Sequence, residues 1–305
     1  MIFKKIVAFF IVVLCIISCS KNSEVKQTGF SIKDDLGSTI YFESVPQRII
    51  SLAPNLTEII YSLGQGKHLI GDTKYCDYPE AAKHVAKIGD MLTFNFEKII
   101  SLKPDIVFIT VAGNTKETYD KFRALGIKMF VSNPVNYAGI KKTYLDLGKI
   151  FGVEQEAKFK VAEWDSIVTA ISSQSKKYAE KSAMFLVDLK PAMLAGKNTF
   201  LNEYLMMCGL KNIAESSPVN YPMFSREDIL RDNPDYIIYM AGKDETVATI
   251  KNAYPEWSQL KAVKNNNIIL VDRDLYPRPG PRFVVALKDL FTRLHPERAV
   301  QQHRQ

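Results

Sequence analysis

Residue patterns typical of catalysis are missing from this sequence of 305 residues. It has no Gly-x-Ser-x-Gly turn, no phosphate-binding glycine loop, no Cys-x-x-Cys pair and no His-Glu-x-x-His motif. The histidines lack the short spacings of metal ligands; they are His68, His84, His295 and His303. We therefore expect a binding protein without a resident cofactor or metal, not an enzyme. One alternative stays open, an exported α/β enzyme that uses Cys76 or Asp77.

Large side chains with a polar or polarisable group collect in a few predicted loops, which follow strands or precede helices. The carboxyl ends of parallel strands are where α/β folds bind ligands, so these side chains are candidate ligand contacts. They are Tyr75, Tyr78, Met91, Met193, Tyr221, Tyr276 and Arg278. Such a set suits a bulky, partly flat organic ligand. Within the segment RPGPR (278–282), one guanidinium could contact an anionic ligand group, or Arg282 could pair with a carboxylate of the fold.

Two glutamates occupy matching places in an internal repeat. The segment FNFEKIISLKPDIVFI (94–109) aligns without a gap with FSREDILRDNPDYIIY (224–239). Each copy reads as a short amphipathic helix, a Pro-Asp turn and a buried strand. Glu97 and Glu227 stand seven residues before the proline of their copy. The repeat predicts two similarly built lobes, each presenting one equivalent glutamate.

The elements around these residues alternate between strand and helix, which favours two α/β lobes with mainly parallel sheets. We place the N-terminal lobe at 29–150, beginning with a β-hairpin, and the C-terminal lobe at 181–305. Between them, residues 153–178 contain neither Gly nor Pro, so we expect one long interlobe helix within 151–180. Its predicted apolar stripe is Phe159, Ala162 or Trp164, Ile167 or Val168, and Ile171.

The first helix of the N-terminal lobe, at 56–63, follows a strand and the loop Ala53-Pro54-Asn55. Asn55 and Glu58 have the spacing of a helix N-cap and its reciprocal partner. The loop has none of the glycines that a dinucleotide site needs, which excludes nucleotide binding there.

The N-terminus predicts export. Residues 1–18 combine Lys4 and Lys5 with a short apolar run, as in a signal peptide. The small residue before Cys19 resembles the lipobox of bacterial lipoproteins, which implies a lipidated Cys19 and a polar tether at 19–28 that holds the protein at a membrane; the alternative is an ordinary secretory signal in which Cys19 is incidental. Cys76 and Cys208 remain, and we expect two free, buried thiols. The net charge is +7, but the lysines are scattered, so nucleic-acid binding has little support.

Taken together, seven segments resemble the substrate-binding lipoproteins of bacterial ABC importers for iron complexes, haem and vitamin B12. They are RIISLAPNLTEIIYSLG (48–64), YCDYP (75–79), NFEKIISLKPDIVF (95–108), AGKNTFLNEYL (195–205), GLKNI (209–213), FSREDILRDNPDYIIY (224–239) and RPGPR (278–282). The cobalamin-binding type is the most similar, although Met91 and Tyr221 stand where that type carries tryptophans.

The resemblance implies a fold of two α/β lobes joined by one long helix, with the ligand between them. It implies that Glu97 and Glu227 dock on the two subunits of a permease, and that the protein acts as an exported, lipid-anchored monomer. The expected ligand is a cobalamin-like corrinoid. Two alternatives stay open in the same role: haem, for which Tyr75 or Tyr78 could serve as axial ligand, and a ferric siderophore, which Tyr276 and Arg278 could bind.

Overall fold

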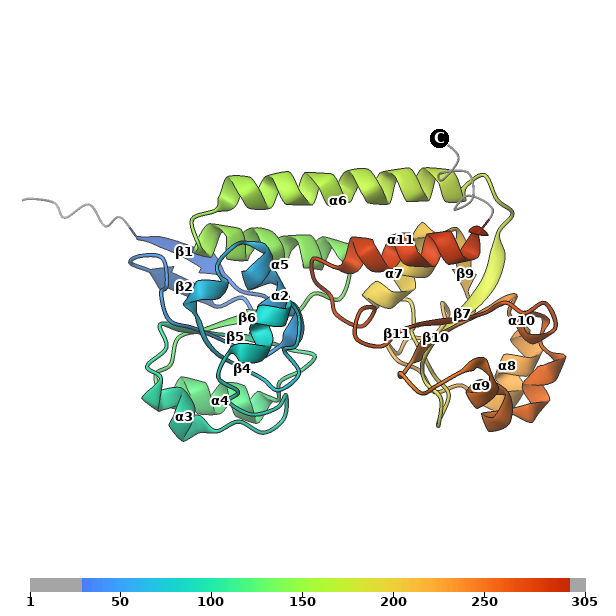
Figure 1. Cartoon of the computed structure of the whole chain (residues 1–305), viewed down its shortest axis with the longest axis horizontal. Helices are drawn as coiled ribbons and strands as arrows, with labels where there is room; N and C mark the ends of the chain where they lie inside the picture. Colours follow the sequence, from blue (N-terminus) through green and yellow to red (C-terminus); the bar gives the residue numbers. More distant parts are fainter. Residues whose placement is uncertain (1–28, 297–305) are drawn as a thin grey trace, which may run out of the picture.

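The computed structural model describes residues 29–296, and the structural statements below concern this part of the chain. Two α/β lobes lie side by side beneath the long helix α6 (Glu154–Ser175), as Figure 1 shows. The predicted signal segment, Cys19 and the tether lie outside the described residues, so these stay predictions. Within residues 29–296, no helix combines the length and the apolar character needed to span a bilayer.

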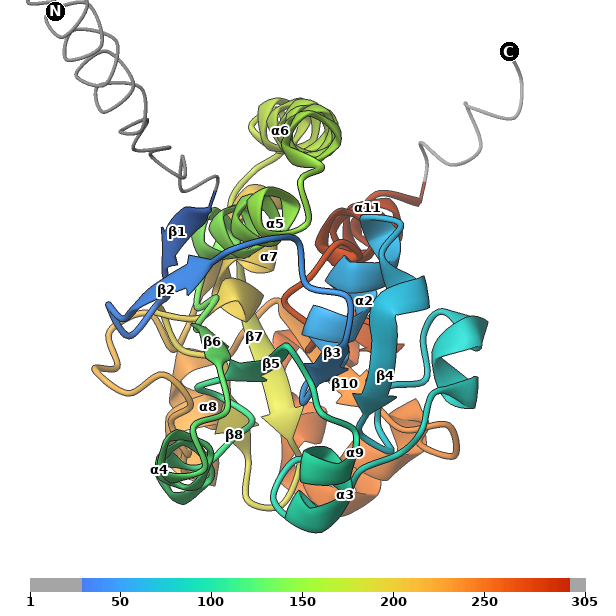
Figure 2. The ribbon, with the colours of Figure 1, turned by 90° about the vertical axis from the view of Figure 1, so that its left-hand side faces the viewer.

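The N-terminal lobe is built on a parallel sheet. Its strands are β3 (Ile49–Ser51), β4 (Leu69–Asp72), β5 (Ile106–Thr110) and β6 (Met129–Ser132), in the order β4-β3-β5-β6. The predicted hairpin is present as β1 (Phe30–Lys33) and β2 (Thr39–Phe42). The helices are α2 (Pro54–Ser62), α3 (Phe96–Ser101), α4 (Lys116–Ala124) and α5 (Tyr137–Ile150), seen from the side of this lobe in Figure 2.

The C-terminal lobe repeats this plan. Its parallel strands are β7 (Lys181–Asp188), β9 (Leu210–Asn212), β10 (Tyr236–Ala241) and β11 (Ile268–Asp272), in the order β9-β7-β10-β11. The short β8 (Met193–Leu194) pairs with β7 in the antiparallel direction. The helices are α7 (Phe200–Met207), α8 (Arg226–Asp232), α9 (Val247–Ala253), α10 (Lys261–Lys264) and α11 (Phe283–Leu294). The prediction of two similar α/β lobes is confirmed.

The repeated Pro-Asp turn has the same structural task in each lobe. The Asp105 carboxylate accepts hydrogen bonds from the backbone of Gln47 and Arg48, just before β3. The Asp235 carboxylate accepts from the backbone and hydroxyl of Ser182 at the start of β7. Each aspartate therefore fixes the beginning of the strand that neighbours its own, which explains why the turn recurs.

One apolar core passes from lobe to lobe. It joins β3, α2 and α5 of the N-terminal lobe to α7, β7 and α11 of the other, with α6 packed against both. At the junction, the ring of Phe283 stacks on Tyr137 and on Tyr204, with centroids 5.1 and 4.5 Å apart. The lobes are therefore connected by packed side chains as well as by the α6 crossover.

The predicted buried face of α6 is correct at Trp164 and Ile171 but wrong at its N-terminal end. Phe159 is 70% exposed, and the buried positions are Ala157, Val161, Trp164 and Ile171. The predicted stripe and the observed stripe both have helical spacing, and they coincide in the C-terminal half of the helix. The helix begins at Glu154 and its buried stripe starts from Ala157, which packs beside Gly148 of α5 where a bulky side chain would not fit.

The predicted cap of the first helix is also wrong. Helix α2 begins at Pro54 with Ala53 as N-cap, and no side chain caps it. Asn55 instead donates to the carbonyl of Pro279, and Glu58 pairs with arginines of the C-terminal lobe. The side chains of Asn55 and Glu58 therefore face the other lobe.

Candidate functional site

The loop after β4 presents two of the predicted ligand-facing tyrosines. Tyr75 and Tyr78 are each 48% exposed. The Lys87 ammonium holds the base of this loop, because it donates to the Asp72 carboxylate and to the carbonyls of Cys76 and Ala82. Burial raises the pKa of Asp72 to about 7, against the opposing effect of Lys87. The backbone of the loop is thus fixed by Lys87, while the phenol rings of its two tyrosines stay accessible.

The thiol between these tyrosines is inaccessible. Cys76 is 1% exposed, and its sulfur lies within hydrogen-bonding distance of the hydroxyls of Thr57 and Thr73. Burial raises its pKa above the ordinary value, more than the two hydroxyls lower it. A nucleophilic cysteine needs an accessible thiolate, so this environment speaks against the enzyme alternative. Cys208 is likewise free and buried, as expected.

Replacing Cys76 with serine is expected to leave ligand affinity within about twofold of the unsubstituted chain, because a buried thiol has no contact with a ligand. Calorimetric titration measures this, with Cys208→Ser as the control, since that thiol is equally buried. Loss of ligand binding in a correctly folded Cys76→Ser chain would contradict the interpretation of Cys76 as an inert buried thiol and would favour the enzyme alternative.

The arginines of the segment RPGPR are neutralised within the protein. Arg278 lies between the carboxylates of Glu58 and Asp77, at 3.0 and 2.7 Å. Arg282 donates two hydrogen bonds to Glu58, at 2.9 and 2.6 Å. The prediction that Arg278 is available to an anionic ligand is wrong, because its side chain is nearly buried and already paired. The alternative that Arg282 pairs with a carboxylate of the fold is confirmed.

The network also sets the charge of Asp77. Burial alone would raise its pKa, but the hydrogen bond and charge of Arg278 hold the pKa below the ordinary value. Asp77 is therefore a carboxylate at neutral pH. Its side chain remains 45% exposed, in contrast to the arginine that it binds. Beside the tyrosines, an accessible negative charge thus accompanies the exposed ammonium of Lys74, which lies 5.1 Å from the centroid of the Tyr75 ring.

Tyr276 is not a ligand contact, which corrects the sequence prediction. The side chain is completely buried, packed among Phe185 and Tyr204, and its hydroxyl donates to Asp289 at 2.8 Å. Position 276 follows β11, as a ligand-facing loop would. The chain turns inward there because α11 supplies a hydrogen-bond acceptor and an apolar wall.

Two predicted contacts of the C-terminal lobe lie next to each other. Met193 of β8 forms a β-bridge with Met223, and Leu194 donates to the carbonyl of Pro222 between Tyr221 and Met223. Tyr221 and Met223 are exposed, and Met193 is partly buried. This ladder brings the two segments, 30 residues apart, into one apolar and aromatic surface.

Met91 occupies a corresponding region of the N-terminal lobe. It is partly buried, its carbonyl accepts a hydrogen bond from Asn114, and its methyl group lies beside Gly113 in the loop after β5. The neighbouring Leu92 is largely exposed. These positions give the N-terminal lobe its own accessible apolar side chains near the carboxyl ends of its strands.

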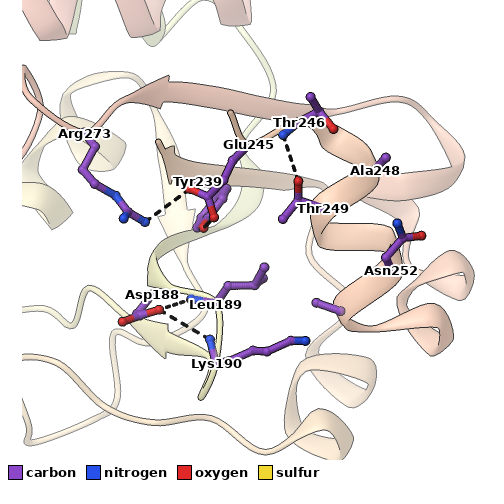
Figure 3. A pocket seen from close by; sticks show the side chains of 11 residues that line it. Asp188, Leu189, Lys190, Tyr239, Glu245, Thr246, Ala248, Thr249, Asn252 and Arg273 are labelled. Carbon is purple, nitrogen blue, oxygen red and sulfur yellow. Dashed lines mark hydrogen bonds and ion pairs between the residues drawn. The ribbon is translucent and has the colours of Figure 1, made fainter. Parts of the chain in front are cut away.

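A cavity of about 620 Å³ lies at the carboxyl ends of β7 and β10, and Figure 3 shows it from close by. All its lining residues belong to the C-terminal lobe, and none was predicted as a ligand contact. Arg273 approaches Glu245 at 3.4 Å, and Tyr239 donates to Glu245 at 2.5 Å. Sequence reasoning missed this polar cavity, because Arg273 and Glu245 form no motif.

The two repeated glutamates have equivalent surroundings. Glu97 is the second residue of α3, after the cap Asn95, and Glu227 is the second residue of α8, after the cap Ser225. Both are exposed, and neither has an ion-pair partner among residues 29–296. In Figure 1, α3 and α8 lie on the side of each lobe that faces away from α6. The fold therefore places one free carboxylate at the matching position of each lobe.

The described part of the chain has no cluster of three or more His, Cys, Asp or Glu side chains that could hold a metal ion. Among residues 29–296, the tyrosines and methionines predicted as ligand contacts thus have no carboxylate-histidine cage beside them.

Known proteins similar to this chain are binding proteins. A family model described as periplasmic binding protein matches residues 49–275. The vitamin B12-binding protein of Photorhabdus laumondii is 31% identical over 252 residues, which cover 83% of this chain and 89% of that protein. An uncharacterised ABC transporter substrate-binding lipoprotein of Bacillus subtilis, YvrC, is 31% identical over 288 residues, covering 91% and 90%.

A solved structure is also similar across both lobes. The periplasmic vitamin B12-binding protein of Vibrio cholerae has a TM-score of 0.72 at 28% identity, with 82% of this chain and 97% of that chain covered. A periplasmic haem-binding protein from Roseiflexus shares the fold, with a TM-score of 0.71 at 24% identity, 82% of this chain and 98% of that chain being covered.

Proposed function

Because this chain belongs to the periplasmic binding protein family and is the substrate-binding component of an ABC importer, we propose that it captures a cobalamin-like corrinoid between its lobes. The family role implies a small-molecule ligand and a permease partner. Transport of this kind requires capture and release and no covalent chemistry.

The accessible aromatic and thioether side chains on both lobes are the observation that carries this proposal. Tyr75 and Tyr78 belong to one lobe, and Tyr221 and Met223 to the other. Large exposed side chains gathered in strand-end loops are typical of a ligand surface rather than of scattered exposure. A corrin ring offers broad apolar faces for such groups, and its amide substituents can donate to the exposed oxygen atoms of Asp77.

Haem in the same role is the second candidate. The exposed phenols of Tyr75 and Tyr78 are the observation that favours it, because a tyrosine oxygen can bind haem iron. An anionic ferric siderophore has weaker support, since Arg278 and Arg282 are already paired with Glu58.

The remaining parts of the proposal concern the context of binding. We propose that Cys19 carries a lipid anchor on the exported side of a membrane, that the protein acts as a monomer, and that it uses no resident cofactor and catalyses no reaction. The YvrC protein, named as a lipoprotein, supports the anchor by similarity. Radiolabelled palmitate incorporation that persists in a Cys19→Ala chain would contradict the anchor.

Residues 20–305 are expected to bind cyanocobalamin with one-to-one stoichiometry in calorimetric titration, and to bind haemin and ferric siderophores at least about 100-fold more weakly.

Tyr221→Ala should weaken cobalamin binding about tenfold, because a large aromatic contact is lost. Tyr41→Ala is the matched control, since that exposed tyrosine lies on the β1–β2 hairpin. Binding of haemin alone would keep the importer role and replace the ligand.

A further inference from the structure

The contact between α2 and the segment after β11 contains a buried carboxylate that joins the two lobes. The Glu58 side chain is 1% exposed. It accepts two hydrogen bonds from Arg282 and one from Arg278, although more than 200 residues separate them in the sequence. Beside it, Asn55 donates to the carbonyl of Pro279. Two neighbouring side chains of α2 thus hold the same segment of the C-terminal lobe.

The arginines that Glu58 fixes also contact the tyrosine loop of the N-terminal lobe. Arg278 donates to the Asp77 carboxylate at 2.7 Å. The guanidinium of Arg282 lies over the ring of Tyr78, 4.1 Å from its centroid. The interactions therefore run from Glu58 through two arginines to two residues of the loop, and they cross between the lobes twice.

Such a network is stiff for electrostatic reasons. A carboxylate withdrawn from water is costly unless all its charge is compensated by well-aligned donors. Here the planar guanidinium of Arg282 meets Glu58 with two parallel bonds, which restricts the direction of the side chain as well as its distance. A shift of one lobe would leave the carboxylate unpaired, so the arrangement favours one interlobe angle.

We propose that Glu58 is a positioning residue for ligand capture. It does not touch the ligand; it fixes Arg278 and Arg282, which hold the Tyr75–Tyr78 loop in its binding geometry before the ligand arrives. Only the ligand-affinity consequence depends on the proposed function, because the order of the loop is a property of the unliganded protein.

Hydrogen exchange of unliganded residues 20–305 tests this directly. The amides of Lys74 and Cys76 are hydrogen bonded, so their exchange reports opening of the loop. Glu58→Gln is expected to accelerate exchange across residues 73–79 about tenfold, because one charged partner of a buried pair is lost.

Glu203→Gln is the matched control. The Glu203 carboxylate of α7 accepts from the backbone of Tyr137 in α5, so it also joins the lobes, but within the described residues no hydrogen bond or ion pair links it to residues 73–79. Exchange of the loop should be unchanged in this variant. Unchanged exchange in Glu58→Gln, or an equal increase in both variants, would overturn the proposal.

A second variant covers the case in which Glu58→Gln fails to fold. Arg282→Lys keeps a positive charge for Glu58 but loses the paired bonds and the planar group over Tyr78, and it should accelerate exchange of the same loop. Normal loop exchange in Arg282→Lys would likewise refute the assignment.

Titration with cyanocobalamin adds the functional measurement. Glu58→Gln should lower affinity about tenfold, mainly through slower association, since fewer molecules hold the loop in the competent geometry. Glu203→Gln should stay within about twofold. If the unsubstituted chain does not bind cyanocobalamin, the ligand assignment fails, and the exchange measurements still decide the role of Glu58.

Discussion

Reversing the charge of both repeated glutamates, as Glu97→Lys with Glu227→Lys, is expected to reduce importer-dependent uptake by at least about 100-fold and to leave ligand affinity within about twofold. Both carboxylates are exposed and free of ion pairs within the described residues, so their removal should not disturb the fold. Two equivalent carboxylates on two similar lobes suit a permease with two equivalent subunits. The effect is measured as uptake of the ligand by cells that lack the unsubstituted chain and carry the variant instead.

The control for this experiment is the double variant Glu117→Lys with Glu215→Lys. Glu117 is exposed and is the second residue of α4, after the cap Thr115, so it matches Glu97 in helix position and in charge. Glu215 supplies an exposed acid of the C-terminal lobe. Uptake should persist in the control. Loss of ligand binding in the Glu97/Glu227 variant, or normal uptake, would refute docking through these residues.

The positions of the two repeated glutamates could be predicted because everything that places them is local. Each stands in a short amphipathic helix, followed by a Pro-Asp turn and a buried strand, and these signals depend on residues within about fifteen positions. The structure places Asn95 and Ser225 as the matching helix caps. The order of strands in the two sheets is a tertiary property that these local signals do not determine.

The arrangement of Asn55 and Glu58 could not be predicted, because its partners lie more than 200 residues away. The spacing of Asn55 and Glu58 is the same for a helix cap and for two side chains that reach across a lobe junction. Only the tertiary structure brings Arg278 and Arg282 to that face of α2. The local pattern predicted a helix cap, but in the structure both side chains bond to the C-terminal lobe instead.

The predictions for Tyr276 and Phe159 were wrong for a related reason. Sequence pattern indicates that a residue follows a strand or repeats with helical spacing, but it does not determine which side of the element meets a neighbour. Tyr276 turns inward to Asp289 on α11, and Phe159 turns outward from α6. Both outcomes depend on how α5, α6 and α11 pack, which no single segment encodes.

The same packing gives the second large expected effect. Phe283→Ala should lower the free energy of unfolding by about 3–5 kcal/mol. The side chain is 1% exposed and stacks on Tyr204 of α7 and Tyr137 of α5, so truncation leaves a cavity where helices from both lobes meet. Urea denaturation of residues 20–305, followed by circular dichroism, measures the change.

Phe159→Ala is the matched control, with the same chemical change on a side chain that is 70% exposed. It should cost less than about 0.5 kcal/mol. Because the apolar core around Phe283 is continuous from β3 to β7, the Phe283→Ala chain should still unfold in a single transition at lower urea. Two separate transitions in the unsubstituted chain would contradict a shared core, since each lobe would then be stable without the junction. A single transition that moves only in Phe283→Ala would mean that the packed junction, and not α6 alone, couples the unfolding of the two lobes.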